Sequence, residues 1–185
     1  LGNFRNTYII AKTDGELLLI DQHIAHERIN FEMLQKSLVR PDTPSQSLLL
    51  PITLDFPPHE ARWLRRNLSL FTGLGFDLED FGENTFLLRG IPLGLDRLKE
   101  EKFFKEIIFE CVISERKLSS QDLFRGITAE IACKASIKAG DILGVKEMEK
   151  LLEKLFLTDD PYYCPHGRPI ILSFSEGDLA KLFKR

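Results

Sequence analysis

The sequence predicts a mixed α+β fold, because strand-like and helix-like stretches follow one another along its 185 residues. Short apolar runs bounded by turn residues are typical of strands, and longer stretches carry apolar residues at helical spacing. Hydrophobic residues make up 43% of the chain and charged residues 29%, which is typical of a globular protein rather than a disordered one. A chain of this length fits one ordinary domain or two small lobes.

The first part predicts a β-hairpin followed by a helix. Apolar runs at 8–11 and 17–21 flank a turn signal at Asp14-Gly15. A helix of about 24–38 follows, and then a polar, proline-containing linker at 40–45 predicts a lobe boundary. The candidate inward positions of this helix are Ile24, Ile29, Met33 and Leu34.

The middle part predicts further strands and helices. A strand at 48–54 leads through two prolines into a helix of about 59–71. A second hairpin joins 76–81 to 85–89, and a helix of about 100–113 follows. The apolar face of that helix carries Phe103, Phe104, Ile107, Ile108 and Cys111, and Cys111 is expected in the core.

The last part predicts two more helices, a strand and a terminal helix. The first helix runs from about 121 to 139, with Gly140 as its stop, and the second covers about 146–156. A buried strand at 170–174 precedes a capping box at 175–178, which opens the terminal helix. The candidate caps of the first helix are Ser119 and Ser120.

Composition narrows the class of protein. No apolar run is long enough to cross a bilayer, and no secretory signal opens the chain. Three scattered cysteines do not make a disulfide framework, so a reducing cytoplasm is expected. The net charge of −3 lacks the excess of Lys and Arg that a protein binding DNA alone needs. Any binding to duplex DNA is therefore expected to be weak in isolation.

The stretch DQHIAHERINFE at 21–32 contains candidate metal ligands. Asp21 lies where a strand is expected to end and a helix to begin. His23 and Glu27 are four residues apart, so a helix places both on one face. Glu32 is five residues further on and is a weaker member.

The stretch CPHGRP at 164–169 offers a second set. In extended backbone, alternate residues face the same way, so the Cys164 thiolate and the His166 imidazole can converge. Gly167 and Pro169 would shape the turn that carries Arg168.

Together the two stretches supply two carboxylates, two imidazoles and one thiolate. This mixture suits zinc, while the carboxylates can also hold manganese or magnesium. Taken alone, the His23/Glu27 pair is more often a surface hydrogen bond, and an isolated C-x-H usually binds no metal.

Four motifs carry a resemblance to a known family. The stretch at 21–32 resembles the DQHA-x-x-E-x-x-x-x-E motif, with Ile24 in place of alanine, and 164–169 matches C-[PN]-HGRP. Residues 132–134 resemble A-C-R, with Lys134 for arginine, which weakens any role needing a bidentate guanidinium. Residues 183–185 fit F-x-R. The motifs occur in the order of the C-terminal endonuclease and dimerisation domain of the MutL mismatch-repair proteins, and the resemblance covers essentially the whole chain.

The resemblance implies roles for individual residues. It makes metal ligands of Asp21, His23, Glu27, Cys164 and His166, with Glu32 and Cys133 as further candidates. Asp21 and Glu27 would be catalytic, with Glu27 shared between ions or closest to the reactive water. DNA contacts would come from Arg168, Lys134 and Arg185. The alternatives are that these arginines cap carbonyls or pair with acids, and that Cys133 simply packs. His26 and His59 are interpreted as exposed polar residues.

A third signal lies at 46–51. It is similar to the Gln-x-Leu-Leu-x-Pro segment through which the family is thought to dock on the replication sliding clamp. The anchor residues would be Gln46, Leu48, Leu49 and Pro51. A buried strand is the competing interpretation.

The resemblance also implies an architecture and partners. Residues 1–41 and 130–185 would form a dimerisation lobe carrying the metal site, and 42–129 an inserted regulatory lobe. The expected partners are a second copy of the chain, the sliding clamp and the mismatch-recognition protein MutS, but no membrane. ATP would be used only through an N-terminal region absent from this sequence. The expected location is the bacterial cytoplasm, in association with the nucleoid.

The resulting hypothesis is a metal-dependent endonuclease that nicks duplex DNA during mismatch repair. The alternative is a non-catalytic dimerisation and clamp-docking module with a structural zinc site. A thiol hydrolase using Cys164 is disfavoured, because no helix N-terminus is predicted beside its thiol.

Overall fold

The computed structural model describes residues 1–39, 44–115 and 120–185, which form a mixed α+β fold, as predicted. These residues form two compact units, the first made of Leu1–Glu32 and Ser136–Arg185 and the second of Met33–Ala135. The sequence-based lobe boundaries at 41/42 and 129/130 remain predictions. Most of the linker that suggested the first boundary, residues 40–43, lies outside the described residues, as does the cap candidate Ser119.

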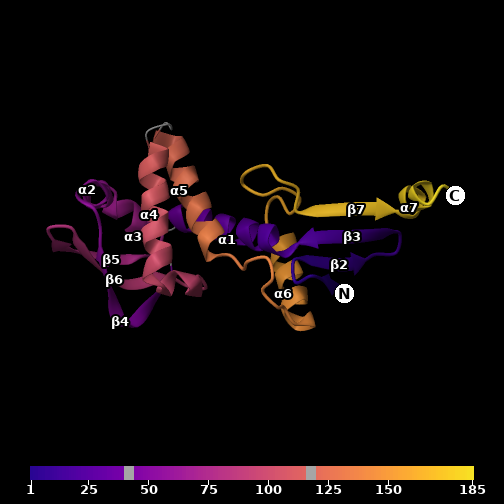
Figure 1. Cartoon of the computed structure of the whole chain (residues 1–185), viewed down its shortest axis with the longest axis horizontal. Coiled ribbons are helices and arrows are strands. Elements are labelled where there is room, and N and C mark those ends of the chain that lie inside the picture. The colour runs from indigo at the N-terminus through magenta and orange to yellow at the C-terminus, as the bar shows by residue number, and fades with distance from the viewer. Residues whose placement is uncertain (40–43, 116–119) are drawn as a thin grey trace. The chain divides into compact units, whose positions relative to one another are not determined.

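The first unit is built on an antiparallel sheet with the strand order β1-β2-β3-β7 (Figure 1). The predicted hairpin is confirmed as β2 (Tyr8–Lys12) and β3 (Glu16–Asp21), and β7 (Ile171–Ser175) pairs with β3. The prediction that this last strand is buried is wrong, because its residues are partly buried or exposed. The edge strand β1 (Gly2–Phe4) was not predicted, since it is short and largely exposed and has no alternating pattern.

Helix α6 (Val145–Phe156) packs on one face of this sheet. Its buried residues Met148, Leu151 and Leu155 recur at helical spacing. They join a core cluster made of Ile9, Ile20, Ala25, Met148, Leu151, Leu155, Cys164 and Ile170. The terminal helix α7 (Glu176–Leu182) follows β7 and begins with the predicted capping box, in which the Ser175 hydroxyl accepts from the Asp178 backbone N–H at 3.1 Å.

Helix α1 (Gln22–Val39) starts directly after β3, so the chain turns from strand to helix without a loop. Among the predicted inward positions, Leu34 is buried, whereas Ile24, Ile29 and Met33 are only partly buried. The boundary between the two units falls within this helix.

The second unit contains a sheet of order β4-β6-β5 and several helices. The strands are β4 (Ser45–Asp55), β5 (Asp77–Gly82) and β6 (Thr85–Pro92). The helices are α2 (Pro58–Arg66), α3 (Leu68–Gly73), a 3-10 turn (Asp96–Lys99), α4 (Glu101–Glu115) and α5 (Ser120–Ala135). Phe71, Phe76 and Phe104 pack together with ring centroids 5.5–5.7 Å apart, and Cys111 is buried as predicted.

Two predicted helices have the wrong extent. The single helix predicted at 59–71 is two helices, because the Asn67 side chain donates to the Trp63 carbonyl at 2.8 Å and interrupts the helical pattern. The helix predicted to reach 139 ends at Ala135. Beyond it, the Ile137 N–H donates to the His26 ring and the Lys138 N–H to the Asp141 carboxylate, so side chains replace the helical acceptors.

Among the described residues, no helix has both the length and the apolar character needed to span a membrane.

Candidate metal centre

The pairing of β3 with β7 brings the two motif segments together. Ile20 pairs with Ile171, and the Asp21 N–H donates to the Ile170 carbonyl at 3.0 Å. The end of β3 therefore lies beside the start of β7. Because 21–32 continues from one strand and 164–169 leads into the other, the register places both segments at the same edge of the sheet.

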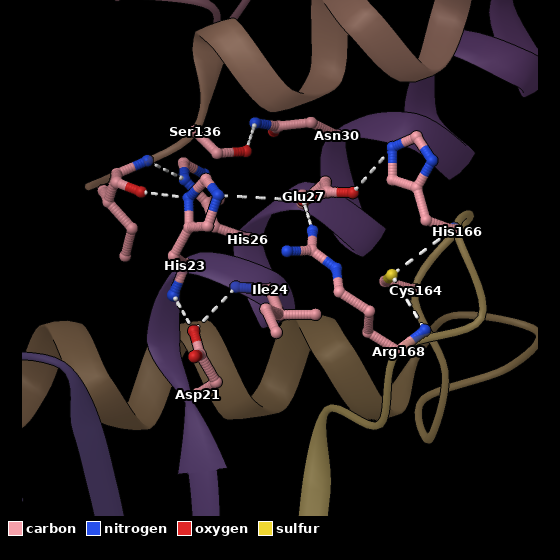
Figure 2. A network of polar contacts seen from close by, with 11 residues as sticks. Asp21, His23, Ile24, His26, Glu27, Asn30, Ser136, Cys164, His166 and Arg168 are labelled. Carbon is pink, nitrogen blue, oxygen red and sulfur yellow. Dashed lines mark hydrogen bonds and ion pairs between the residues drawn. The ribbon is translucent and has the colours of Figure 1, made fainter. Parts of the chain in front are cut away.

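Asp21 caps the start of α1. One carboxylate oxygen, Oδ1, accepts from the backbone N–H groups of His23 at 2.9 Å and Ile24 at 3.0 Å (Figure 2). These donors would otherwise have no partner in the first helical turn. The cap fixes where α1 begins, and thereby places His23 and Glu27 on one face, as predicted.

Glu27 lies at the centre of the site. Its side chain is 0% exposed, and Figure 2 shows His23, His166 and Arg168 directed toward it. His166 Nε2 lies 3.3 Å from Oε1, while His23 Nε2 lies 3.7 Å and Arg168 Nη2 2.7 Å from Oε2. The structure thus brings together three predicted ligands, His23 and Glu27 on α1 and His166 in the second segment.

One oxygen of Glu27 is not satisfied. Oε1 is buried and has no hydrogen-bond partner, although His166 Nε2 is 3.3 Å away, so that contact is an ion-pair distance without hydrogen-bond geometry. A buried carboxylate oxygen without a donor costs free energy unless another cation approaches it.

His23 is oriented as a metal-binding imidazole usually is. Its Nδ1 lies 2.6 Å from the Ile137 carbonyl, and a carbonyl can only accept, so Nδ1 carries the proton. In the neutral ring, Nε2 then presents a lone pair on the side of Glu27. A hydrogen bond from the ring nitrogen that does not bind the metal commonly fixes the tautomer of a histidine ligand.

The 164–169 segment is a tight turn, which corrects the prediction of extended backbone. The Gly167 N–H donates to the Cys164 carbonyl at 2.9 Å, and Gly167 has φ 78°, which favours glycine. Cys164 Sγ accepts from the backbone N–H groups of His166 and Arg168, each at 3.3 Å. The buried sulfur therefore holds the turn that aims His166 at Glu27.

Arg168 pairs with Glu27, as in the alternative of an acidic partner, while its predicted contact with phosphate stays a prediction. Its hydrogen bond to Cys164 is the main cause of its raised pKa, and the charge of Glu27 raises that pKa further, against the lowering effect of burial. The guanidinium thus stays charged beside the buried carboxylate.

Glu32 has partners of its own. Its Oε2 accepts from the Asp159 N–H at 2.8 Å and lies 3.7 Å from Arg28 Nη2. These contacts tie the loop after α6 to α1, and that loop leads directly into Cys164. Its predicted role as a metal ligand stays a prediction.

Two features were not found from the sequence. His26, interpreted as exposed, is partly buried and accepts from the Ile137 N–H at 3.1 Å, whereas His59 is exposed as predicted. Asn30 donates to Ser136 at 3.0 Å. Nothing in the spacing of 21–32 reveals contacts to residues more than a hundred positions away.

Two residues predicted to contact DNA have other surroundings. Lys134 on α5 pairs with Glu106 at 2.8 Å, which raises its pKa. The role of Cys133 as a further ligand stays a prediction. Arg185 follows α7, which begins where Ser175 pairs with Glu16, at the opposite end of the sheet from Asp21. The structure therefore does not bring Arg185 to Glu27 within one chain.

The 46–51 segment is not a regular buried strand. The pairing of β4 with β6 is interrupted between Ser47 and Ile52. Leu49 and Leu50 are strongly exposed there, and Pro51 is exposed, while Gln46 and Leu48 are partly buried.

Comparison with known proteins gives one family. The model of the MutL C-terminal dimerisation domain matches residues 1–143. The chain is 37% identical over its whole length to the DNA mismatch repair protein MutL of Clostridium botulinum strain Loch Maree. It is 37% identical over 98% of its length to that of Halothermothrix orenii, and 35% identical over its whole length to that of Clostridium perfringens strain 13. It spans 27–28% of the length of these relatives.

Proposed function

Because the chain belongs to the MutL C-terminal dimerisation domain family, we propose that it is a metal-dependent endonuclease domain that nicks duplex DNA in mismatch repair and joins two copies of the protein. The observation that carries the catalytic part is Glu27, a fully buried carboxylate facing two imidazoles with one oxygen unsatisfied. Such an arrangement is costly in a purely structural site and useful in a metal centre.

The donor set fits a metal. His23, Glu27, His166 and Cys164 would hold it, and Asp21 has a carboxylate oxygen beyond the one that caps α1. Imidazole and thiolate suit zinc, whereas the carboxylates also suit manganese or magnesium. When bound, the ion would supply Lewis-acid activation of the phosphodiester and of water.

The residues of the chain have separate tasks in this proposal. Glu27 would be shared between ions or lie closest to the reactive water, and its Oε1, to which no hydrogen bond is donated, would be the oxygen that accepts a proton. The His23 tautomer is fixed by Ile137, and Cys164 holds the turn that orients His166. Cys164 is only 4% exposed, which argues against a role as a nucleophile.

The open face of the first sheet supports pairing with a second copy. Strand register places Ile10, Leu19 and Leu172 in one row across three strands, on the face opposite Ile9 and Ile20. The same face carries Phe4, Tyr8, Ile10, Leu17, Leu19, Leu172 and Phe174. A contiguous apolar face of this kind is typical of an isologous homodimer interface.

Partners would supply most of the DNA affinity. The net charge of −3 is too negative for strong independent binding to phosphates. The exposed Leu49 and Leu50 support docking of 46–51 on the sliding clamp, and MutS would bring the domain to the mismatch.

Nicking of supercoiled plasmid by the full-length dimer in manganese tests the proposal. Glu27→Ala and Asp21→Asn should abolish nicking while sedimentation still shows a dimer. Glu149→Ala, which removes an exposed carboxylate on α6, is the matched control and should nick normally. Undiminished nicking by both site variants would contradict the catalytic assignment. One zinc per chain without nicking by the unmodified protein would favour the alternative, a docking module with structural zinc.

A further inference from the structure

The two side chains of the Arg168–Glu27 ion pair differ in their exposure to solvent. Glu27 is fully buried, whereas the Arg168 side chain is 48% exposed. The backbone of Arg168 is fixed, because its N–H donates to Cys164 Sγ and its carbonyl accepts from the Cys164 N–H at 2.9 Å. These backbone contacts hold the turn, so they can stay in place when the guanidinium leaves Glu27 toward solvent.

Arg168 supplies positive charge to the carboxylate that would hold the metal. Removing the partner of a buried charge is strongly destabilising, so Glu27 needs a cation nearby whether or not metal is bound. Arg168 donates a hydrogen bond to the carboxylate, whereas neither imidazole does so. His23 is fixed with its proton on Nδ1, and His166 makes no aligned hydrogen bond to Oε1. In the metal-free site the charge of Glu27 is thus compensated chiefly by Arg168.

A divalent cation bound to Glu27 would make the nearby Arg168 guanidinium unfavourable. A guanidinium 2.7 Å from the same carboxylate would then face a like charge at short range in a poorly solvated site. Bulk water can solvate the half-exposed arginine side chain when it moves, whereas the carboxylate is held in the interior. The arginine, rather than the carboxylate, is the group that can move.

Resting on the proposed metal site, we infer that Arg168 is an internal counter-ion that competes with the metal for Glu27 and is released on metal binding to contact a backbone phosphate of DNA. The competition couples the two ligands. Metal frees Arg168 for phosphate, and by linkage phosphate bound to Arg168 raises the affinity of Glu27 for metal. The metal-loaded site would then form mainly in protein that is bound to DNA.

Zinc affinity measured by competition with a chromophoric chelator tests the inference in the full-length dimer. Arg168→Gln keeps a polar side chain but removes the charge, and should tighten zinc binding by about tenfold, within the usual range of site–site coupling. Arg168→Lys retains the charge and should stay close to the unmodified protein. Arg62→Gln, on an exposed position of α2, is the control and should change nothing.

A second arm adds a short duplex oligonucleotide. The duplex should tighten zinc binding several-fold in the unmodified protein and in Arg62→Gln, but not in Arg168→Gln. Weaker or unchanged zinc binding in Arg168→Gln would overturn the inference and make Arg168 a positioning residue for the turn. If Arg168→Gln does not fold without zinc, Arg168→Lys and the unmodified protein still test the inference. Duplex should tighten zinc binding equally in both. No change in zinc affinity in either would overturn the inference.

The two proposals fail in different ways. Zinc binding that survives Glu27→Gln unchanged would remove the metal site itself. Zinc binding that is lost in Glu27→Gln but weakened in Arg168→Gln would leave the proposed function standing and reject only the competition.

Discussion

Glu27 and Glu32 lie five residues apart on α1 and are both buried, yet their surroundings differ. Glu32 accepts a backbone N–H from Asp159 and faces Arg28, so its buried carboxylate is compensated by a hydrogen-bond donor and an arginine. Glu27 keeps an oxygen without a donor and faces two imidazoles and an arginine. Burial alone therefore does not distinguish the two glutamates. The unsatisfied oxygen, together with the two imidazoles, is what supports the proposed role of Glu27 as a ligand.

The sharpest way to break this comparison is to neutralise each glutamate in turn. Glu27→Gln should weaken zinc binding and slow nicking by at least about 100-fold, since even residues that only orient ligands cost about 10–100-fold. Glu32→Gln keeps the shape of its side chain and should change either quantity by less than about tenfold. Chelator competition and plasmid nicking measure the two effects. Equal losses in both variants would make Glu32 a ligand as well.

Metal removal extends the comparison to stability. Zinc at a hundred times its dissociation constant should stabilise the unmodified protein by about 2.7 kcal/mol, because the ligand binds only the folded state. Glu32→Ala should show the same gain on adding zinc, whereas Glu27→Gln, with an affinity at least about 100-fold lower, should gain at most about 0.4 kcal/mol. Urea unfolding with EDTA and with zinc provides the measurement. A zinc gain that persists in Glu27→Gln would place the ion elsewhere.

Glu32 should matter most for the fold. Glu32→Ala leaves the Asp159 N–H and Arg28 without this carboxylate, and should lower the free energy of unfolding by roughly 1–3 kcal/mol in the absence of metal. Chemical denaturation gives the value, and faster proteolysis near 158–163 should accompany it. No loss of stability would mean that the loop is held by other contacts.

Asp21, at the start of the same helix, offers the smallest effect and a clean separation of roles. Asparagine caps a helix about as well as aspartate, so Asp21→Asn should preserve stability, whereas Asp21→Ala should cost about 1 kcal/mol. Both variants should lose nicking if the other oxygen binds metal. Normal nicking by Asp21→Asn would restrict Asp21 to capping.

The same contrast explains what the sequence could and could not predict. The hairpin β2–β3, helix α1 and strand β7 follow from local apolar patterns, and the family motifs single out His23, Glu27, Cys164 and His166. Contacts between residues far apart in the chain leave no pattern in the local sequence, so they were not predicted. Examples are the His26–Ile137 contact and the Arg168–Glu27 pair, which joins positions 141 residues apart.

Local chemistry also misled the prediction of helix ends. The pattern at 59–71 is apolar at helical spacing throughout, but the Asn67 amide takes a backbone acceptor and divides it. The helix predicted to reach 139 stops at Ala135, because side chains of the first unit accept the next backbone N–H groups. Such competition depends on partners that only the folded chain supplies.

The measurement that tests the central claim most directly is anomalous scattering at the zinc edge from crystals of the zinc-loaded protein. The account predicts a peak bonded to Glu27, with His23 and His166 as neighbours and the Arg168 guanidinium moved away from the carboxylate. A crystal with full zinc content but no peak there, and with the Arg168–Glu27 pair intact, would contradict it.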